Sequence, residues 1–419
     1  MPLLKLAFTL LIFGILSTPN YSHAQAPEFA GHIKYQVGQA YHDNSSLQAA
    51  LGPDSPFSEQ LDLRVNLERA ADSLRFIAQA EALGYHSTGL QAERQARLSP
   101  YSSAERISDR TRLFDLTVEV ANESDVELYT RIDRLYLDYA QAAFVLRAGR
   151  QAITWGNGLN FQVIDIFNPF SPVEIDKDYK TGDDIVYSQM LFFDGSDLQF
   201  LAVPRRDFET HDPESSASSF AAKYHARLAD SGIEYDLMAA QHFNEPHLAL
   251  GLSRDLFGSI ARADVVWIDL EGRSSATNFL LNLDRSWYIL ESNFYSFIEY
   301  FHNSIGVSQD QYLIPDEALS SRISRGELYT LSTDYLSVGA RLEASPLLNL
   351  YLTYISNLRD GSSFVQNRNV YEITQDLSLL VGFSYPLGSN GTEFGGLKLP
   401  NDQYLRVSPA IFLRTAYFF

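Results

Sequence analysis

Charged residues gather in the middle of the chain and could together act on charged solutes. The basic members are Arg131, Arg134, Arg147 and Arg150, and the acidic members with their polar neighbour are Asp165, Asn168, Glu174, Asp176, Asp183 and Asp184. Arginine keeps its charge and makes forked contacts with carboxylates. If the two sets face each other across a channel, their field orients charged or dipolar solutes. Alternatively, their ion pairs only tie a loop to the wall of the protein.

Few other residues suggest chemistry. The chain has no cysteine, which excludes disulfides and thiolate metal sites, and its formal net charge of −20 argues against a nucleic-acid partner. His302 and Ser304 lie on one face of a predicted strand, as in a lipolytic barrel, but no asparagine partner is identifiable. The sequence has no His pair at metal-ligand spacing and no phosphate-binding glycine loop. We therefore expect no enzyme activity, metal or cofactor.

The elements that must position these residues are β-strands. From Leu61 to Glu68 every second residue is apolar, and segments around 114–120, 233–239, 336–343 and 377–385 repeat the pattern. Period two is typical of strands with one apolar and one polar face. Many of these segments run for about 10–15 residues, long enough to cross a bilayer at a tilt. After residue 26 no apolar stretch reaches the roughly 18 residues of a helical span.

Turns and loops alternate between the predicted strands. Short turns lie at 71–73, 122–125, 194–196 and 230–232, and longer polar loops lie around 43–57, 89–110, 157–182, 207–217, 306–330 and 388–403. Short turns at one end and long loops at the other are typical of outer-membrane barrels. We therefore predict an all-β fold, a transmembrane antiparallel β-barrel of roughly 16–18 strands, with short periplasmic turns and long extracellular loops.

The two ends of the chain carry export signals. Residues 1–24 are a predicted cleaved signal peptide, because Lys5 precedes an apolar run and Ser22-His23-Ala24 supplies small residues for cleavage. Residues 25–419 are then expected to form a single barrel. The last residue is Phe419, and Tyr417 lies on the same face of the last strand. This end resembles the terminal strand that the barrel-assembly machinery of Gram-negative bacteria recognises, which implies an outer-membrane location.

One stretch of about 40 residues carries a more specific resemblance. It contains Gly149-Arg150-Gln151, then Trp155-Gly156, and then Asn168-Pro169. In this order the motifs resemble a broad, porin-like group of Gram-negative outer-membrane barrels, and they are more distantly similar to alginate-export-type barrels. The resemblance implies a porin-like channel in which the Asn-Pro segment leads into the pore.

The loop that follows these motifs has an unusual composition. Residues 160–175 are rich in apolar side chains and contain Pro169 and Pro172, which do not fit a central strand. An apolar loop should avoid water, so we expect loop 156–184 to fold into the lumen and narrow it; the alternative is an exposed loop used for packing. A bulge at Gly149 would leave strand parity open. Our hypothesis is that Arg150 faces the pore and Arg147 supports it through ion pairs.

Together these features predict a channel for passive diffusion of small solutes, surrounded by outer-membrane lipid and lipopolysaccharide, with an oligomer possible. Two alternatives stay open. A structural barrel sheath around a secretion or electron-transfer partner should leave a wide lumen without a constriction loop. A lipolytic barrel needs an asparagine partner for His302 and Ser304 at the membrane boundary.

Overall fold

The computed structural model describes most of the chain, in eight ranges of residues. The described residues are 28–96, 107–176, 178–207, 209–229, 231–289, 291–312, 316–399 and 402–419. The predicted signal peptide, residues 1–24, lies outside them.

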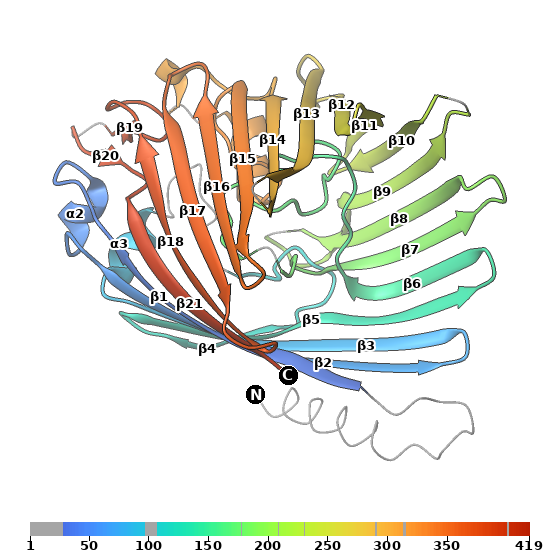
Figure 1. Cartoon of the computed structure of the whole chain (residues 1–419), viewed down its shortest axis with the longest axis horizontal. Helices are drawn as coiled ribbons and strands as arrows, with labels where there is room; N and C mark the ends of the chain where they lie inside the picture. Colours follow the sequence, from blue (N-terminus) through green and yellow to red (C-terminus); the bar gives the residue numbers. More distant parts are fainter. Residues whose placement is uncertain are drawn as a thin grey trace.

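Eighteen antiparallel strands form a closed barrel, which confirms the predicted fold class (Figure 1). Consecutive strands of the wall are hydrogen-bonded neighbours, so the topology is that of a simple meander. The strands of the wall are β1 (Glu28–Ala40), β2 (Phe57–Ala71), β3 (Leu74–Ser87), β5 (Val126–Gln141), β6 (Phe144–Gln151), β7 (Asp183–Leu191), β8 (Asp197–Arg206), β9 (Pro213–Arg227), β10 (Ile233–His242), β11 (Glu245–Leu256), β12 (Ser259–Ile268), β13 (Ala276–Ile289), β14 (Ser292–His302), β15 (Asp334–Ser345), β16 (Leu348–Asn357), β17 (Ser363–Glu372), β18 (Leu377–Leu387) and β21 (Ala410–Phe418).

The remaining elements lie at the end of the barrel that carries the long loops. They are the helices α2 (Leu47–Leu51), α3 (Leu90–Ala96) and α4 (Glu317–Ser324), the 3-10 turn η1 (Gln309–Gln311), the strand β4 (Thr117–Asn122) and the small pair β19 (Leu397–Lys398) and β20 (Tyr404–Leu405). Within the described part of the chain, no helix combines the length and the apolar character that a bilayer crossing requires.

The alternation in the sequence separates an apolar outer surface from a polar interior. On β2, Leu61, Leu63 and Val65 are exposed, whereas Arg64 between them is buried. The same exposed apolar positions recur around the wall, for example on β10, β13, β16 and β18. A belt of this size is far larger than the apolar patches that soluble monomers expose. The outer surface therefore fits a lipid environment.

The predicted long loops lie at one end of the barrel, and the predicted short turns lie at the other end with one exception. Two further short connections, 243–244 and 358–362, also lie at the end with the long loops. The turns at 71–73 and 194–196 lie at the end that also holds the start of β1 and the end of β21. The turn at 122–125 joins β4 to β5 at the other end, because Val126 pairs with His86 near the end of β3. Its polar composition resembles that of the periplasmic turns and does not reveal which end of a strand it follows.

The first and last strands close the barrel. Gly31 and Phe419 exchange two backbone hydrogen bonds, of 2.8 and 3.1 Å. A Cβ atom on Gly31 would lie 2.2 Å from the carbonyl oxygen of Arg64 and 2.7 Å from the Phe419 ring. The closure therefore requires glycine at position 31, and it leaves Tyr417 and Phe419 exposed on the outer surface with their rings 6.4 Å apart.

The first prediction concerns Phe419. A charged residue at this position, as in Phe419→Asp, replaces a lipid-facing ring at the closing seam, so we expect less protein in the outer-membrane fraction. The aromatic variant Phe419→Tyr is the control and should insert normally. Quantitative immunoblotting of membrane fractions measures both. Equal outer-membrane levels of Phe419→Asp and the wild-type protein would contradict the assembly role of this residue.

Candidate functional site: a loop inside the lumen and a charged wall

The connection between β6 and β7, residues 152–182, is here called the lumen loop. Its residues contact inward-facing side chains of β1, β5, β8, β12, β14, β17 and β21. These strands lie on all sides of the barrel (Figure 1). Only a segment that crosses the interior can reach all of them, so the lumen loop lies inside the barrel.

Buried carboxylates on the wall hold the first part of the lumen loop. The Glu299 carboxylate of β14 accepts hydrogen bonds from the backbone N–H groups of Leu159, Asn160 and Phe161, at 2.7, 2.9 and 2.7 Å. Asp264 of β12 accepts two more bonds from Asn157, one from its backbone N–H and one from its side-chain amide, both at 2.7 Å. These carboxylates satisfy backbone donors that would otherwise be buried without partners, a loss of about 1–3 kcal/mol each.

Apolar side chains hold the same part of the loop. Trp155, Phe161, Ile164 and Phe167 are buried and form one cluster with inward-facing residues of β7 to β17. Phe161 stacks on Phe301 of β14, with ring centroids 4.9 Å apart. This packing fills the β7–β16 side of the lumen.

The second part of the lumen loop crosses to the opposite wall. Lys34 of β1 donates to Asp176 and Asp178, each at 2.6 Å, and Arg414 of β21 contacts Asp176 at 2.7 Å. Arg368 of β17 donates to the carbonyl oxygen of Ile175 at 2.8 Å. Lys34 is only 3% exposed. The loop carboxylates therefore neutralise basic residues of the wall.

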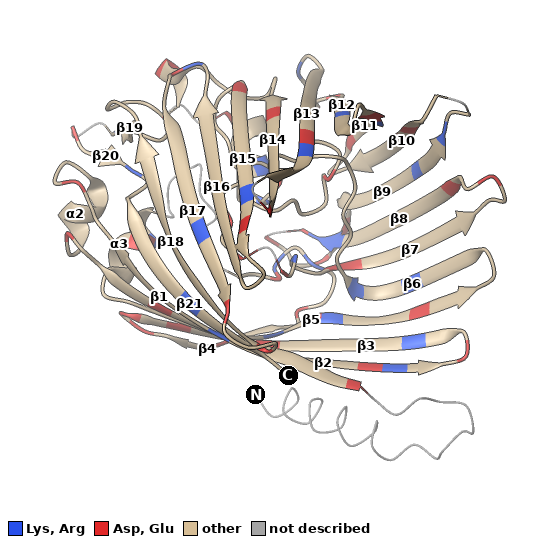
Figure 2. Ribbon diagram, in the orientation of Figure 1, with Lys and Arg blue, Asp and Glu red and all other residues tan. Residues whose placement is uncertain are grey.

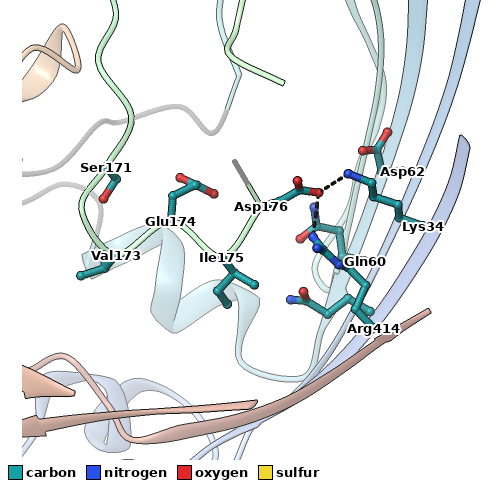
Figure 3. A pocket seen from close by; sticks show the side chains of 10 residues that line it. Lys34, Gln60, Asp62, Ser171, Val173, Glu174, Ile175, Asp176 and Arg414 are labelled. Carbon is teal, nitrogen blue, oxygen red and sulfur yellow. Dashed lines mark hydrogen bonds and ion pairs between the residues drawn. The ribbon is translucent and has the colours of Figure 1, made fainter. Parts of the chain in front are cut away.

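A cavity of about 210 Å³ lies beside these ion pairs (Figure 3). Wall residues from β1, β2 and β21 line one side, and residues 171–176 of the lumen loop line the other. Figure 3 shows Asp176 extending from the loop toward Lys34 and Arg414. Glu174 belongs to the same lining. Charges of opposite sign thus meet at this cavity: Lys34, Arg414 and Asp62 lie on the wall, and Glu174 and Asp176 lie on the loop.

The predicted Arg131 and Arg134 lie in a buried cluster on β5. Both contact Asp133, at 3.6 and 2.6 Å, and Arg64 of β2 contacts the same carboxylate at 3.0 Å. Asp133 is an extra residue at an irregularity where Gln79 pairs with Arg134 and the next pair is Ala80 with Ile132. The irregularity turns consecutive charged side chains to one face.

The end of the lumen loop is fixed to this cluster. The Gly182 N–H donates to Asp133 at 3.0 Å, and a Cβ atom on Gly182 would lie 2.2 Å from the Asp133 carbonyl oxygen. Arg134 also donates to the carbonyl oxygen of Lys180. The cluster therefore ties the returning strand of the loop to β5.

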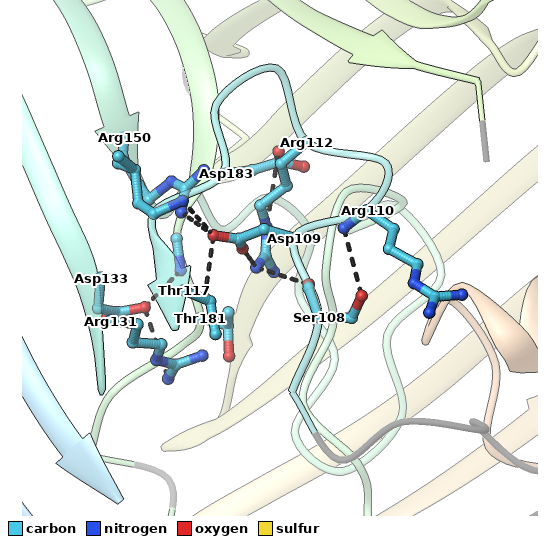
Figure 4. Close-up of polar contacts among 12 residues, drawn as sticks. Ser108, Asp109, Arg110, Arg112, Thr117, Arg131, Asp133, Arg150, Thr181 and Asp183 are labelled. Atoms are coloured by element: carbon cyan, nitrogen blue, oxygen red, sulfur yellow. Dashed lines mark hydrogen bonds and ion pairs between the residues drawn. The ribbon is translucent and has the colours of Figure 1, made fainter. Parts of the chain in front are cut away.

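The structure places Arg150 inside the wall rather than on the open lumen. Arg150 is 2% exposed and pairs with Asp184 at 2.9 Å and with Asp109 at 2.7 Å. It also donates to the carbonyl oxygen of Phe114 at 2.6 Å. Figure 4 shows Arg150 directed at Asp109 and the segment around it. The physical reason is that β6 and β7 are short and leave a gap in the wall.

Residues 107–122 fill that gap. β4 pairs with β5 beyond the point where β6 ends. The backbone of Arg112 forms an isolated antiparallel β-bridge with the backbone of Arg205 on β8. Asp109 holds the segment together, because its carboxylate also accepts from the Leu116 N–H and the Thr117 hydroxyl, both at 2.9 Å. Asp109 had no signal in the sequence that set it apart from other loop aspartates.

Arg147 lies nearer the periplasmic end and contacts Asp138 at 3.3 Å, with its guanidinium 5.1 Å from the Tyr136 ring. Asp183 contacts Arg205 at 2.6 Å. Figure 2 shows basic and acidic residues side by side on β2, β3, β5 and β6. The predicted arginines thus pair with carboxylates of the same wall, but of the predicted carboxylates only Asp184 is among these partners. Asp176 is the member that meets basic residues on the opposite wall.

The remaining predicted residues stabilise the middle of the lumen loop. Asp165 forms a buried ion pair with Lys180, whose ammonium group also donates to the Ile153 carbonyl oxygen at 2.6 Å. Burial raises the pKa of Asp165 and lowers the pKa of Lys180, against the attraction between the two charges. Asn168 donates to the Thr181 carbonyl oxygen at 2.9 Å. These contacts pin the two halves of the loop to each other.

His302 and Ser304 do not act on each other in the contacts found among the described residues. His302 contacts Asp334 at 2.8 Å, whereas Ser304 contacts Asn278 and the Thr277 N–H. A different serine, Ser219, lies 2.7 Å from His242, which contacts Glu327 at 3.0 Å. Ser219 and His242 are both buried under the loops, so this chain of hydrogen bonds offers no accessible nucleophile. Over the described ranges no group of three or more His, Asp or Glu residues could hold a metal ion.

Sequence reasoning missed the wall residues that receive the lumen loop. Glu299, Asp264, Lys34 and Arg414 are far in sequence from the motifs around position 150. Their only signal in the sequence is a charged residue between two apolar residues of a strand, as for Asp264 between Ala263 and Val265. That signal could have marked them as interior charges.

Comparison with known proteins identifies the fold. No protein-family model matches the sequence, and no curated protein matches it. Solved structures do match: a BenF-like porin from Pseudomonas fluorescens Pf-5 has 10% sequence identity, 94% of this chain and 99% of that chain covered, and a TM-score of 0.53. OccAB2 and OccAB3 from Acinetobacter baumannii have 9% and 11% identity, TM-scores of 0.53 and 0.51, and coverage of 96% and 94% of this chain and 99% of theirs. The chain has a porin fold.

The second prediction concerns Arg150. Arg150→Ala leaves the buried Asp184 without its cationic partner and leaves Asp109 with Arg112 alone; breaking a buried pair costs about 3–5 kcal/mol of unfolding free energy. We expect a lower unfolding midpoint in detergent and an unchanged reversal potential in a salt gradient. Arg273→Ala is the control, because Arg273 forms a partly exposed pair with Asp316 in the extracellular connections. A shift in reversal potential at wild-type stability would show that Arg150 acts on permeating ions instead.

Proposed function

We propose that the protein is a channel for passive diffusion of small solutes across the outer membrane of a Gram-negative bacterium. The observation that carries the proposal is a closed barrel with a lipid-compatible outer surface whose lumen is crossed by an anchored loop. The porin fold of the compared structures supports it. Diffusion through such a barrel needs no energy input, because each solute moves down its own concentration gradient.

We propose that the solute path follows the side of the lumen formed by β17, β18, β21, β1 and β2. The apolar cluster of the lumen loop occupies the other side, and the 210 Å³ cavity lies on the proposed path. Lys34 and Arg414 on the wall and Glu174 and Asp176 on the loop would meet solutes there. Such opposed charges at a narrow point act at close range and would select solutes by charge.

Several finer expectations belong to this proposal. The motifs Gly149-Arg150-Gln151, Trp155-Gly156 and Asn168-Pro169 would mark a porin-like group, with alginate-export-type barrels as distant relatives. Phe419 and Tyr417 would be the signal for the barrel-assembly machinery. Lipopolysaccharide would contact the outer surface, and an oligomer is possible. Export by a cleaved signal peptide would bring the chain to this membrane.

Two earlier alternatives receive less support. A sheath around a partner needs a wide bore, whereas the lumen loop reaches walls on all sides. A lipolytic barrel needs an accessible dyad, whereas His302 and Ser304 have separate partners. We therefore favour a channel over an enzyme.

The third prediction tests the constriction. Replacing residues 160–175 by a Gly/Ser linker of equal length removes the apolar anchors, each worth about 25 cal/mol per Å² of buried apolar area. The loop should then leave the lumen, so we expect a several-fold higher single-channel conductance in planar bilayers. The control is a linker of the same kind in place of the exposed residues 209–212. An intact barrel of the linker variant with unchanged conductance would mean that the loop is not the constriction, and absence of conductance in the wild-type protein would overturn the channel itself.

The fourth prediction tests the charges at the cavity. The double variant Asp176→Asn with Asp178→Asn leaves Lys34 and Arg414 without their carboxylate partners and adds net positive charge beside the cavity. We expect the reversal potential in a salt gradient to shift toward anions. The control, Glu209→Gln with Asp212→Asn, removes the same charge from the exposed connection between β8 and β9. Equal reversal potentials for the two double variants would contradict a path along this side of the lumen.

A further inference from the structure

Two glutamine side chains line the cavity beside the lumen loop without anchoring the loop. Gln36 of β1 and Gln60 of β2 lie directly opposite each other in the register of the two strands, and Gln36 also lies opposite Arg414 of β21. Side chains alternate between the two faces of a strand, and Lys34, two residues before Gln36, contacts the loop. Both amides therefore face the lumen as close neighbours.

Neither of these amides is committed to another group of the protein. Gln60 is exposed and Gln36 is half-buried, and within the part of the chain that the structure describes neither side-chain amide has a hydrogen bond. Gln366 of β17 differs, because its amide donates to the Val173 carbonyl oxygen of the lumen loop at 2.9 Å. An amide carries two donors and an acceptor, so Gln36 and Gln60 keep both kinds of group for a solute.

The charges around the two amides are already paired. Asp176 of the lumen loop contacts Lys34 at 2.6 Å and Arg414 at 2.7 Å. Asp62 of β2 lies 3.0 Å from a ring nitrogen of His32. An anion that bound either basic residue would have to compete with Asp176, whereas a neutral solute would disturb none of these pairs. The two amides are therefore the groups that can add most to the binding of a neutral solute.

The loop side of the cavity offers apolar contact. Val173 and Ile175 line this side, and their backbone carbonyl oxygens accept from Gln366 at 2.9 Å and from Arg368 at 2.8 Å. These bonds hold the backbone of the loop against the wall, so the two aliphatic side chains are kept at the cavity. Figure 3 shows Ile175 on the loop side of the cavity and Gln60 on the wall side.

We propose that this cavity is a binding subsite for neutral, polyhydroxylated solutes of monosaccharide size, and that Gln36 and Gln60 determine its specificity. The proposal rests on the channel function proposed above and names a class of solute for it. A sugar ring has aliphatic C–H faces and a rim of hydroxyl groups, each of which donates and accepts. The rim would bond to the two amides, and one face would lie against Val173 and Ile175.

The size of the cavity favours a single ring. Its volume is about 210 Å³, below the range of about 300–1,000 Å³ that is typical of sites for drug-sized ligands.

Single-channel recording with D-glucose tests the subsite. Glucose should reduce the wild-type current in a saturable manner, and the concentration dependence gives a binding constant. Gln36→Met with Gln60→Met keeps the length of both side chains but removes both amides. Glucose should then bind about tenfold more weakly or worse, the effect of two lost hydrogen bonds.

The matched control is Gln189→Met. Gln189 of β7 lies opposite Gln199, whose side chain accepts from Trp155 inside the barrel, and Gln189 does not line the cavity. This variant loses an inward amide elsewhere on the wall, so it should bind glucose as the wild-type protein does.

Two further solutes separate the role of the amides from that of the charges. Tetrahydropyran, which has the same ring without hydroxyl groups, should bind much more weakly than glucose. D-Glucuronate, which adds a carboxylate to the sugar, should bind no more tightly than glucose. Tighter binding of glucuronate, or equal binding of glucose by the wild-type protein and the double variant, would overturn the subsite.

Saturation-transfer difference NMR measures glucose binding without current, on protein in a detergent that has no sugar headgroup. Transfer to the glucose protons should be strong with the wild-type protein and Gln189→Met, and weak with the double variant. Conductance without glucose binding would overturn the subsite alone. Glucose binding that depends on Gln36 and Gln60, in a protein without conductance, would overturn the channel alone.

Discussion

Backbone N–H groups that enter the lumen of a barrel must find partners there, and this constraint governs the interior of the protein. A non-repetitive segment cannot pair with itself, so the strands must supply acceptors at inward positions. Glu299 and Asp264 supply them to residues 157–161, and Asp133 supplies one to Gly182. The buried carboxylates on the wall are hydrogen-bonded to these donors, so they are not isolated charges. They also fix the orientation of the loop.

The same constraint explains why charge is distributed unevenly over the barrel. The formal net charge of −20 describes the whole chain. The arginines of β2, β5 and β6, however, form ion pairs with nearby carboxylates. Arg150 completes a wall in which short strands leave a gap, and Arg64 and Arg134 share Asp133. Charge at the cavity instead comes from Lys34, Arg414 and Asp62 on the wall and from the acidic end of the lumen loop. Local pairing, and not total charge, therefore sets the field that a solute would meet.

The fold was predictable because alternation is a local property. Leu61 to Glu68 specify one strand face without reference to any other strand, and an apolar loop with Pro169 and Pro172 is recognisable on its own. The partners of the loop were not predictable, because Glu299 lies 138 residues from Phe161 and meets it only through the register of the strands between them. Strand parity does not predict the direction of Arg150, because of the glycine at position 149; its direction depends on the point at which β6 ends and β7 begins, where Asp109 and Asp184 receive its side chain.

An asymmetric lumen follows from these anchors. The first half of the lumen loop is fixed by both apolar packing and backbone hydrogen bonds, whereas residues 173–176 and Asp178 are fixed mainly by ion pairs and by two bonds to carbonyl oxygens. Apolar packing does not respond to solute charge or ionic strength, but partly exposed ion pairs do. We therefore infer that the apolar packing on the β7–β16 side keeps its position whatever ions are present. On the β17–β2 side, the ion pairs of the lumen loop respond to the ions that pass through the proposed channel.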